Sequence, residues 1–587
     1  MQRYSLQELT SAVETERGSD SLSEQASDYE DEEYNSSKYY TDEEYTNLPE
    51  VTLTSFTETG EGESTIPVLK QRSYTGRMII SSALADALCA DLGVDRMLEE
   101  LNTVLGTSYS LDSSVISILN SYISQSVDFG TAYAYLRRYW KDIRTIESKL
   151  RTREAEDREM RQSVLADGRI TKPDVPPRRV WDLYANRVVP YWVACNKLRA
   201  ISHAWVEERD RMDVMTPING CEWPVPMPKD VNLDLIRIEM LNTRPNWVPR
   251  FKAEYAWLDV LCLRQEGGKS EHLRLDEWKL DVPTIGWVYW YAWQVVCYFS
   301  GLGRPLCLAP GYFESDRCWF RRAWTLQEMT LWSIIAGVTG KDATNTQVER
   351  SFYKQLASLR SMRLGSTSIL DLLSEMRNRV STKLLDQVAG LVYLLEPDVI
   401  PIYDAEQSPA DAWEALMDVM KPESQVQLLF SYPEPGNGMK RWRPSWSQVM
   451  SSRILGPRFH WEQHPIYRTE DPDIDYYMGY CIESGQVRGL CQVPNKPMLR
   501  QGKLVFDDAN GESHTLKVIA NHSYPIPDGF YKLLGCKGIH SNPDRWVVGH
   551  VRQDGRFEKL SVFRSAGDEE ADLYSLALEG HLKTFLC

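Results

Sequence analysis

Residues 197–205, KLRAISHAW, form a short apolar run with the length of a buried strand. Three more runs of this kind follow along the chain: YAWLDVLCL (255–263), WQVVCYF (293–299) and WSIIAGVT (332–339). Segments of helix length separate them. Short, nearly continuous apolar strands that alternate with helices are typical of a parallel sheet covered on both faces. The sequence therefore predicts an α/β unit with a parallel sheet over residues 175–340.

The flanking regions have different patterns, so the chain of 587 residues is predicted to be multidomain. Residues 77–170 repeat apolar side chains at helical spacing, which predicts a helical N-terminal region. Residues 341–440 continue with helices and form a helical extension. Residues 442–587 contain turn residues and short alternating strands, which predict a small β-rich C-terminal domain.

The first 70 residues are predicted to be a disordered acidic leader. Seventeen acidic and three basic residues lie within residues 1–66, so this segment carries most of the net charge of −17. With so few aliphatic side chains it cannot bury enough apolar area to offset the entropy of ordering. Two roles stay open: a phosphorylated or partner-docking tail, and a leader that only improves solubility.

Composition and charge exclude several classes of function. The folded part has no dense stripe of Lys and Arg, so nucleic acid is not an expected partner. The 11 cysteines are scattered and never spaced as C-x-x-C, which favours a reducing, cytoplasmic location over a disulfide framework. The apolar stretch 284–302 has Trp and Tyr through its middle, so we expect a buried helix and strand rather than a membrane span.

Four segments of the α/β region, in their order along the chain, resemble the motifs of the fungal heterokaryon incompatibility (HET) domain, a relative of the TIR signalling fold. They are RAISHAW (199–205), AEYAWLDVLCLRQ (253–265), VYWYAWQVV (288–296) and DRCWFRRAWTLQE (316–328). The segments RRVWDLYANRVV (178–189) and LLDQVAGLVYLL (384–395) also resemble those that flank this domain. The resemblance implies a TIR- or flavodoxin-like sheet and a role in self/non-self recognition that leads to growth arrest or cell death.

Two positions depart from the family pattern. Val206 stands where HET domains usually have glycine, and Arg264 stands where they usually have asparagine. Both fall where strands meet loops, which is the edge where ligands bind a parallel sheet. The departures weaken the inference that a family active site is intact.

Glu328 is the candidate catalytic residue. TIR-related enzymes that hydrolyse NAD use a glutamate in a similar W-x-x-x-E setting, and the resemblance implies Trp324 and Glu328 as the counterparts. On a helix these two residues share a face. A fixed carboxylate would stabilise the positive charge that develops on the ribose as the nicotinamide bond breaks. NAD is therefore the candidate substrate.

Other residues of the region have a ligand-binding and a structural interpretation. Arg317, Arg321 and Arg322 could hold the phosphates of a dinucleotide, or could pair with Glu328 and stabilise the domain. Asp259 ends an apolar run and could contact a ligand or cap the next segment. His203 could line a ligand pocket or be specific to the fold. Its neighbour Ser202 points to the opposite face of a strand, so the two cannot form a nucleophile–base pair.

A metal site and a triphosphate-binding loop are not expected. His460 and His464 have the spacing of metal ligands but stand between prolines and without a third ligand. Two functions from different classes remain. The first is an effector of incompatibility or innate immunity that assembles through its HET domain, as a homo-oligomer or with other proteins, and acts by NAD hydrolysis. The second is a non-enzymatic scaffold for other proteins.

Overall fold

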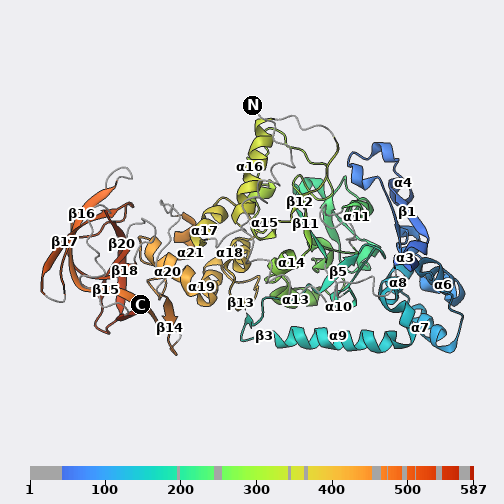
Figure 1. The fold of residues 1–587 in the computed structure, drawn as a ribbon, viewed down its shortest axis with the longest axis horizontal. Coiled ribbons are helices and arrows are strands. Elements are labelled where there is room, and N and C mark those ends of the chain that lie inside the picture. The colour runs from blue at the N-terminus through green and yellow to red at the C-terminus, as the bar shows by residue number, and fades with distance from the viewer. Residues whose placement is uncertain are drawn as a thin grey trace.

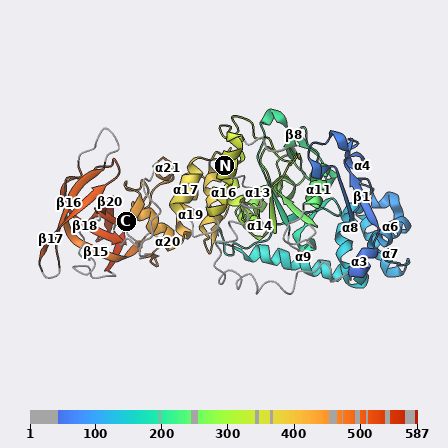
Figure 2. The same cartoon turned by 45° about the horizontal axis from the view of Figure 1, so that its top comes forward.

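The computed structural model describes residues 42–194, 198–243, 254–340, 346–362, 368–451, 465–471, 474–491, 499–508, 511–536, 545–566 and 582–587. The described parts follow one another along the long axis: an N-terminal region, a mixed α/β unit, a group of helices and a C-terminal sheet (Figure 1). Figure 2 shows the same order after a turn of 45°. The predicted β-rich C-terminal region and the mixed α/β composition are confirmed.

The structure differs from the predicted disordered leader over residues 42–70. These residues and those that follow form α3 (Asp42–Asn47), β1 (Glu50–Thr54), α4 (Ser55–Thr59), η2 (Glu63–Thr65), η3 (Leu69–Gln71) and β2 (Ser73–Arg77), with β1 and β2 antiparallel. Thr54 and Thr57 form a capping box at the start of α4, and Leu53 and Ile66 are buried. A few caps and anchors thus order an acidic segment. The prediction for residues 1–41 lies outside the described residues.

Residues 82–163 are helical, as the apolar periodicity predicts. The elements are α5 (Ser82–Ala85), α6 (Cys89–Leu105), α7 (Ser113–Ser124), α8 (Phe129–Leu136), η4 (Arg137–Thr145) and α9 (Ile146–Ser163). Asp112 caps α7 and Asp128 caps α8 through their side-chain carboxylates. The charged helix α9 runs along one side of the α/β unit (Figure 1). It is followed by β3 (Leu165–Ala166) and β4 (Arg169–Ile170).

The α/β unit is built on a six-stranded sheet in the order β12-β11-β7-β10-β5-β6. Its strands are β5 (Arg179–Asp182), β6 (Arg187–Pro190), β7 (Arg199–His203), β10 (Tyr255–Leu258), β11 (Gln294–Tyr298) and β12 (Ile334–Ile335). Strands β7, β10, β11 and β12 are parallel, whereas β5 and β6 form an antiparallel hairpin at one edge. Every residue of β7, β10 and β11 is buried, which explains why apolar side chains dominate these strands and why their few polar residues stand near the ends.

Short helices connect the parallel strands. They are α10 (Tyr191–Ala194), α11 (Leu233–Asn242), α12 (Asp259–Cys262), α13 (Arg274–Asp281), α14 (Ile285–Tyr291) and α15 (Thr325–Glu328); β8 (Arg211–Val214) and β9 (Val225–Pro228) form a separate hairpin. The apolar stretch 284–302 divides into α14 and β11, a helix followed by a strand as expected. Among the described residues, no helix is both long enough and apolar enough to cross a membrane.

The helical extension packs between the α/β unit and the C-terminal sheet (Figure 1). Its elements are α16 (Gln347–Met362), α17 (Ile369–Arg377), α18 (Leu385–Val392), η9 (Tyr393–Leu395), β13 (Ile400–Pro401), α19 (Pro409–Val419), α20 (Pro422–Ser431) and α21 (Trp446–Ser451). Its buried side chains belong to the same apolar core as those of the α/β unit. The two parts are therefore packed as one body rather than as separate domains.

The C-terminal sheet closes on itself. Its strands are β14 (Ile466–Arg468), β15 (Asp475–Arg488), β16 (Arg500–Asp507), β17 (Ser513–Ala520), β18 (Gly529–Cys536), β19 (Arg545–Val551), β20 (Phe557–Ser565) and β21 (Leu582–Leu586). Six antiparallel strands form the ring β15-β16-β17-β20-β19-β18, which the β15–β18 pair completes. The ring encloses a second apolar core that includes Phe506, Leu533, Trp546 and Phe563.

A buried ion-pair network joins this sheet to the helical extension. Asp475, at the start of β15, accepts hydrogen bonds from Lys440 (3.0 Å), Trp442 (3.2 Å) and Arg443 (3.0 Å). Arg443 also donates to Asp418 of α19 at 2.8 Å. Because three donors share one buried carboxylate, the sheet is fixed in orientation as well as in place.

Candidate active site at the carboxyl edge of the parallel strands

Strand β7 brings two polar residues to its carboxyl end, between β10 and β11. Ser202 and His203 are adjacent and buried, and they contact different partners because successive side chains of a strand point to opposite faces. Ser202 contacts Glu328 and Trp319, whereas His203 contacts Asp259. The prediction that Ser202 and His203 do not act as a nucleophile–base pair agrees with this geometry.

Glu328 is held by a short chain of hydrogen bonds. Ser202 Oγ donates to Glu328 Oε2 at 2.5 Å, and Trp319 Nε1 donates to Ser202 Oγ at 2.8 Å. Since the indole N–H occupies the acceptor side of the hydroxyl, the hydroxyl proton is directed at the carboxylate. The local sequence indicates neither contact, because Ser202 lies 117 positions before Trp319 and 126 positions before Glu328.

The surroundings of Glu328 bring its pKa close to neutral pH. Burial, together with the carboxylate of Asp259, raises the pKa of Glu328 to about 7, although the Ser202 hydrogen bond acts in the opposite direction. Glu328 itself is only 8% exposed. A carboxyl group with a pKa near 7 can change its charge at physiological pH, which is what a catalytic acid, base or charge stabiliser requires.

His203 and Asp259 form a second polar pair at the same edge. His203 Nε2 lies 2.9 Å from Asp259 Oδ1, and the same oxygen accepts the backbone N–H of Val260 at 2.8 Å. Burial lowers the pKa of His203, but the facing carboxylate of Asp259 outweighs it, so that the net change is upward. Asp259 stands in the first turn of α12, whose N-cap is Leu258, and its carboxylate orients the imidazole of His203.

The three arginines of DRCWFRRAW are in different environments. Arg317 pairs with Glu207 at 3.5 Å, and Arg321 pairs with Asp316 at 2.9 Å. Arg322 forms no ion pair with any residue that the structure describes, and it lies within electrostatic range of both Glu328 and Asp259. Burial lowers the pKa of Arg322. Of the three arginines, Arg322 is the one whose charge acts on Glu328.

Trp324 and Glu328 occupy the two ends of a single helical turn. Trp324 has helical dihedral angles (φ −61°, ψ −37°) and precedes α15, which consists of four residues. Its side chain is half-buried against the apolar core. The W-x-x-x-E segment thus has local helical geometry, although it is not part of a helix longer than this one turn.

The helical extension holds this turn in place. Arg379, which is 2% exposed, donates to the backbone oxygen of Arg322 and to Thr325 Oγ1, both at 2.8 Å. Val380 also donates its backbone N–H to the oxygen of Arg321, and accepts from Ala323 at 3.1 Å. The position of Glu328 therefore depends on residues about 50 positions later in the chain.

The two departures from the family pattern have structural roles. Arg264 is buried between Glu222 (3.6 Å) and Glu277 (3.4 Å), and it stacks over the ring of Trp223. Val206 packs against Gly301, where an added Cβ would approach a Val206 methyl group to 2.8 Å. Both residues stabilise the loops around the site rather than reaching into it.

Two further features lie away from Glu328. An apolar hollow is lined by residues of α18, α19 and β13, among them Val388, Ala412 and Pro401. Asp508, Glu512 and His514, on the hairpin between β16 and β17, have potential ligand atoms within 4.8 Å of one another. Hydrogen bonds within the hairpin explain this contact, since Asp508 accepts from both other residues. His460 and His464 lie outside the described residues.

Comparisons of the chain with family models, with curated proteins and with solved structures found no match. The class of protein is therefore defined by its own geometry. It is a mixed α/β protein with a buried glutamate, whose pKa is raised to about 7, at the carboxyl edge of its parallel strands.

Proposed function

We propose that this protein is an effector of incompatibility or innate-immune type, in which a HET-like α/β unit hydrolyses NAD and so causes growth arrest or cell death. The observation that carries the proposal is Glu328, a buried carboxyl group with a pKa of about 7 at the edge where parallel sheets bind ligands. The parallel strands lie in the order second, first, third, fourth, which matches the start of the flavodoxin-type order. That order supports a TIR- or flavodoxin-like assignment.

In this mechanism Glu328 acts as a carboxylate. The bond between ribose C1′ and the nicotinamide nitrogen breaks, and nicotinamide leaves with the bonding electrons. Positive charge develops on the ribose and is stabilised by the carboxylate. Water then adds to C1′ and loses a proton, which gives ADP-ribose. Ser202, oriented by Trp319, fixes the position of the carboxylate, and Arg322 supplies a cation for a phosphate.

A test compares wild type with Glu328→Gln, which preserves the size of the side chain. We expect cellular NAD in yeast, at matched expression, to fall with wild type and to stay constant with the variant. Glu314→Gln is the matched control, because Glu314 is exposed on the preceding loop. Its NAD loss should equal that of wild type. Equal NAD levels in wild type and Glu328→Gln would contradict NAD hydrolysis.

The same proposal fixes the pH dependence. Since the ionised form of Glu328 is the active one and its pKa is raised to about 7, the rate of NAD hydrolysis by the purified chain should increase as the pH rises through about 7. A rate that decreases over this interval would assign Glu328 the role of an acid instead.

A non-enzymatic scaffold is the second candidate function. It is favoured by the 8% exposure of Glu328 and by the ion pairs of Arg264 at a loop where the family has asparagine. In that case assembly with other proteins or with further copies of the chain causes the cellular effect. Cell killing that persists in Glu328→Gln, without NAD loss, would support the scaffold.

A further inference from the structure

The outer face of the C-terminal ring carries a row of three cations. Arg488 of β15 lies opposite Lys503 of β16, and Lys503 lies opposite Lys517 of β17. All three side chains are exposed, because Val487 and Leu504 beside them point into the core of the ring. Arg488 and Lys503 form no ion pair with any residue that the structure describes. Like charges that face each other across strands lower the stability of a sheet, and an anionic partner would remove this repulsion.

An exposed aromatic ring extends the row onto the next strand. Phe530 of β18 lies opposite Gln486 of β15 and is 65% exposed. Gln486 and Arg488 share a face, since alternate residues of a strand point the same way. Across the adjacent strands β17, β16, β15 and β18, the sheet thus presents three cations followed by an aromatic side chain. These four residues, here called the cationic face, are Lys517, Lys503, Arg488 and Phe530.

The helical extension covers a different part of the ring. Lys559 of β20 and Arg545 of β19 donate to backbone oxygens at the end of α20. The strands β16 and β17 lie farther out, at the end of the molecule away from the helices (Figures 1 and 2). The described part of the chain therefore leaves the cationic face open to a partner.

The chain itself contains a segment of complementary charge. Residues 28–34, DYEDEEY, hold five acidic side chains and no basic one. In an extended conformation, alternate residues of this acidic segment would lie on one side. They are Asp28, Glu30, Glu32 and Tyr34. Three acids followed by an aromatic residue match the order of the cationic face. Three interstrand spacings cover about 14 Å and six extended residues about 20 Å, a difference that flexible lysine side chains can accommodate.

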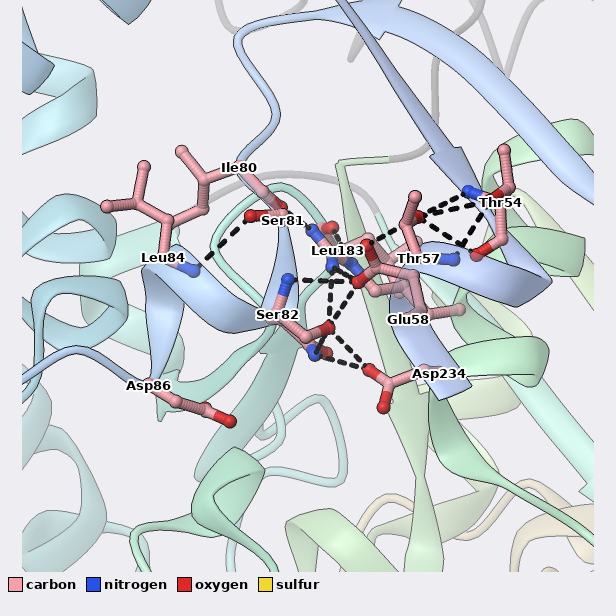
Figure 3. Close-up of polar contacts among 12 residues, drawn as sticks. Thr54, Thr57, Glu58, Ile80, Ser81, Ser82, Leu84, Asp86, Leu183 and Asp234 are labelled. Atoms are coloured by element: carbon pink, nitrogen blue, oxygen red, sulfur yellow. Dashed lines mark hydrogen bonds and ion pairs between the residues drawn. The ribbon is translucent and has the colours of Figure 1, made fainter. Parts of the chain in front are cut away.

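The position of α3 decides which copy of the chain supplies this segment. The described chain begins with α3 at Asp42, and the residues after it are anchored on the α/β unit, where Ser82 contacts both Glu58 of α4 and Asp234 of α11 (Figure 3). Both α3 and α4 lie at the end of the long axis opposite β16 and β17 (Figure 1). Only residues 35–41 separate the acidic segment from α3, and they span at most about 30 Å. A compact chain of 587 residues is about 60 Å across. The acidic segment therefore reaches the cationic face of a second copy and not its own.

We propose that the cationic face binds the acidic segment 28–34 of a second copy of this chain. The inference does not depend on NAD hydrolysis. Each copy offers one segment and one face, so pairs and longer assemblies can form. Residues 67–587 contain 66 acidic and 63 basic residues, so the folded parts of two copies repel each other little.

Sedimentation velocity of the purified full chain tests the proposal. We expect wild type to associate with increasing protein concentration at about 50 mM salt and to be monomeric at about 500 mM, because salt screens exposed charges. Arg488→Gln combined with Lys503→Gln should weaken the association by about tenfold or more. This face variant removes a repulsion between neighbouring cations, so it should remain folded.

A second variant removes charge from the other partner. Glu30→Gln combined with Glu32→Gln should weaken the association to a similar extent. An equimolar mixture of the two double variants should associate again, because the face variant supplies an intact segment and the segment variant supplies an intact face. This association should stop at pairs, since each pair then has no further functional face or segment.

Lys229→Gln combined with Lys269→Gln is the matched control, because it changes the net charge by the same amount at two exposed positions of the α/β unit. It should associate as wild type does. The proposal is overturned if wild type stays monomeric at low salt, if the face variant associates like wild type, or if the mixture remains monomeric. Because the measurement uses purified protein without NAD, its outcome is separate from that of the proposed function.

Discussion

At the residue scale, the ionised side chain of Glu328 lowers the stability of the folded chain. Its pKa is about 7 in the folded chain against an ordinary value of 4.5. A raised pKa means that its contribution to stability is complete below about pH 4.5 and is lost as the pH rises through about 7. The loss amounts to roughly 3 kcal/mol. Buried carboxyl groups with raised pKa values are concentrated at functional sites.

This cost predicts the effect of Glu328→Gln on stability. The amide cannot ionise and can still accept the Ser202 hydrogen bond, so the variant should be more stable than wild type by up to about 3 kcal/mol at about pH 8. The gain should be much smaller at about pH 5. Urea denaturation at both pH values measures the difference, and a variant that is less stable at about pH 8 would disprove the assigned environment.

Lys559 of β20 is a second titratable residue with an unusual position. It is 2% exposed and donates to the backbone oxygen of Leu429, near the end of α20, at 2.8 Å. Burial lowers the pKa of Lys559 to about 7. Because the unfolded chain holds this proton up to about pH 10.5 and the folded chain does not, stability should rise with pH between about 7 and 10.5.

Lys559→Met should therefore raise the melting temperature of the C-terminal sheet at about pH 7. Replacing a buried charge by an apolar side chain of similar length contributes about 1–4 kcal/mol. The benefit should disappear only above about pH 11, where the lysine is neutral in both the folded and the unfolded state. Lys503→Met, on the exposed side of β16, is the control and should change the melting temperature little at either pH. A destabilised Lys559→Met variant would argue against this prediction.

At the element scale, the single turn of α15 is stable only because the helical extension supports it. Four residues are too few for an independent helix. Arg379 satisfies the oxygen of Arg322 and Thr325 Oγ1 from outside the α/β unit. The boundary predicted at residue 340 therefore does not separate two independent functional parts.

Arg379→Ala should release this turn. The change removes the donor to Thr325 Oγ1 and one of the two donors to the backbone oxygen of Arg322, which costs about 1–3 kcal/mol. We expect faster hydrogen exchange at residues 319–328 and loss of any activity that depends on Glu328. Thr382→Ala, an exposed position a few residues later, serves as the control. Unchanged exchange at residues 319–328 in Arg379→Ala would show that the turn is held by other contacts.

Elements with a continuous local pattern could be predicted from the sequence, and contacts between distant residues could not. The strands β7, β10 and β11 fall within the quoted apolar runs, because a strand buried on both faces needs no polar position. The contact of Ser202 with Glu328 joins residues 126 positions apart, and no local spacing indicates it. The ordered structure of residues 50–77 cannot be predicted locally for the same reason, since the residues that these positions contact lie on α11.

At the scale of the whole molecule, neighbouring parts are joined through buried ionisable groups. The N-terminal region meets the α/β unit at Glu58 and Asp234, and the helical extension meets the C-terminal sheet at Asp475 and Lys559. These contacts between parts of the molecule therefore include charged side chains as well as apolar packing. Because each of these contacts relies on a few charged side chains, a single substitution should loosen one contact without unfolding the rest of the molecule.

The closed C-terminal sheet has a consequence for the order in which the chain folds. Its closing pair, β15 with β18, aligns Tyr480 with Gly535, whereas the backbone hydrogen bonds within each helix join residues only four positions apart. Contacts between residues far apart in sequence form slowly, because the intervening chain must first be ordered. Until the ring closes, β15 and β18 each expose an unpaired edge, and Phe530 of β18 remains 65% exposed even afterwards. We therefore expect newly made chains to be most prone to self-association during this interval, and ring closure to be the event that ends it.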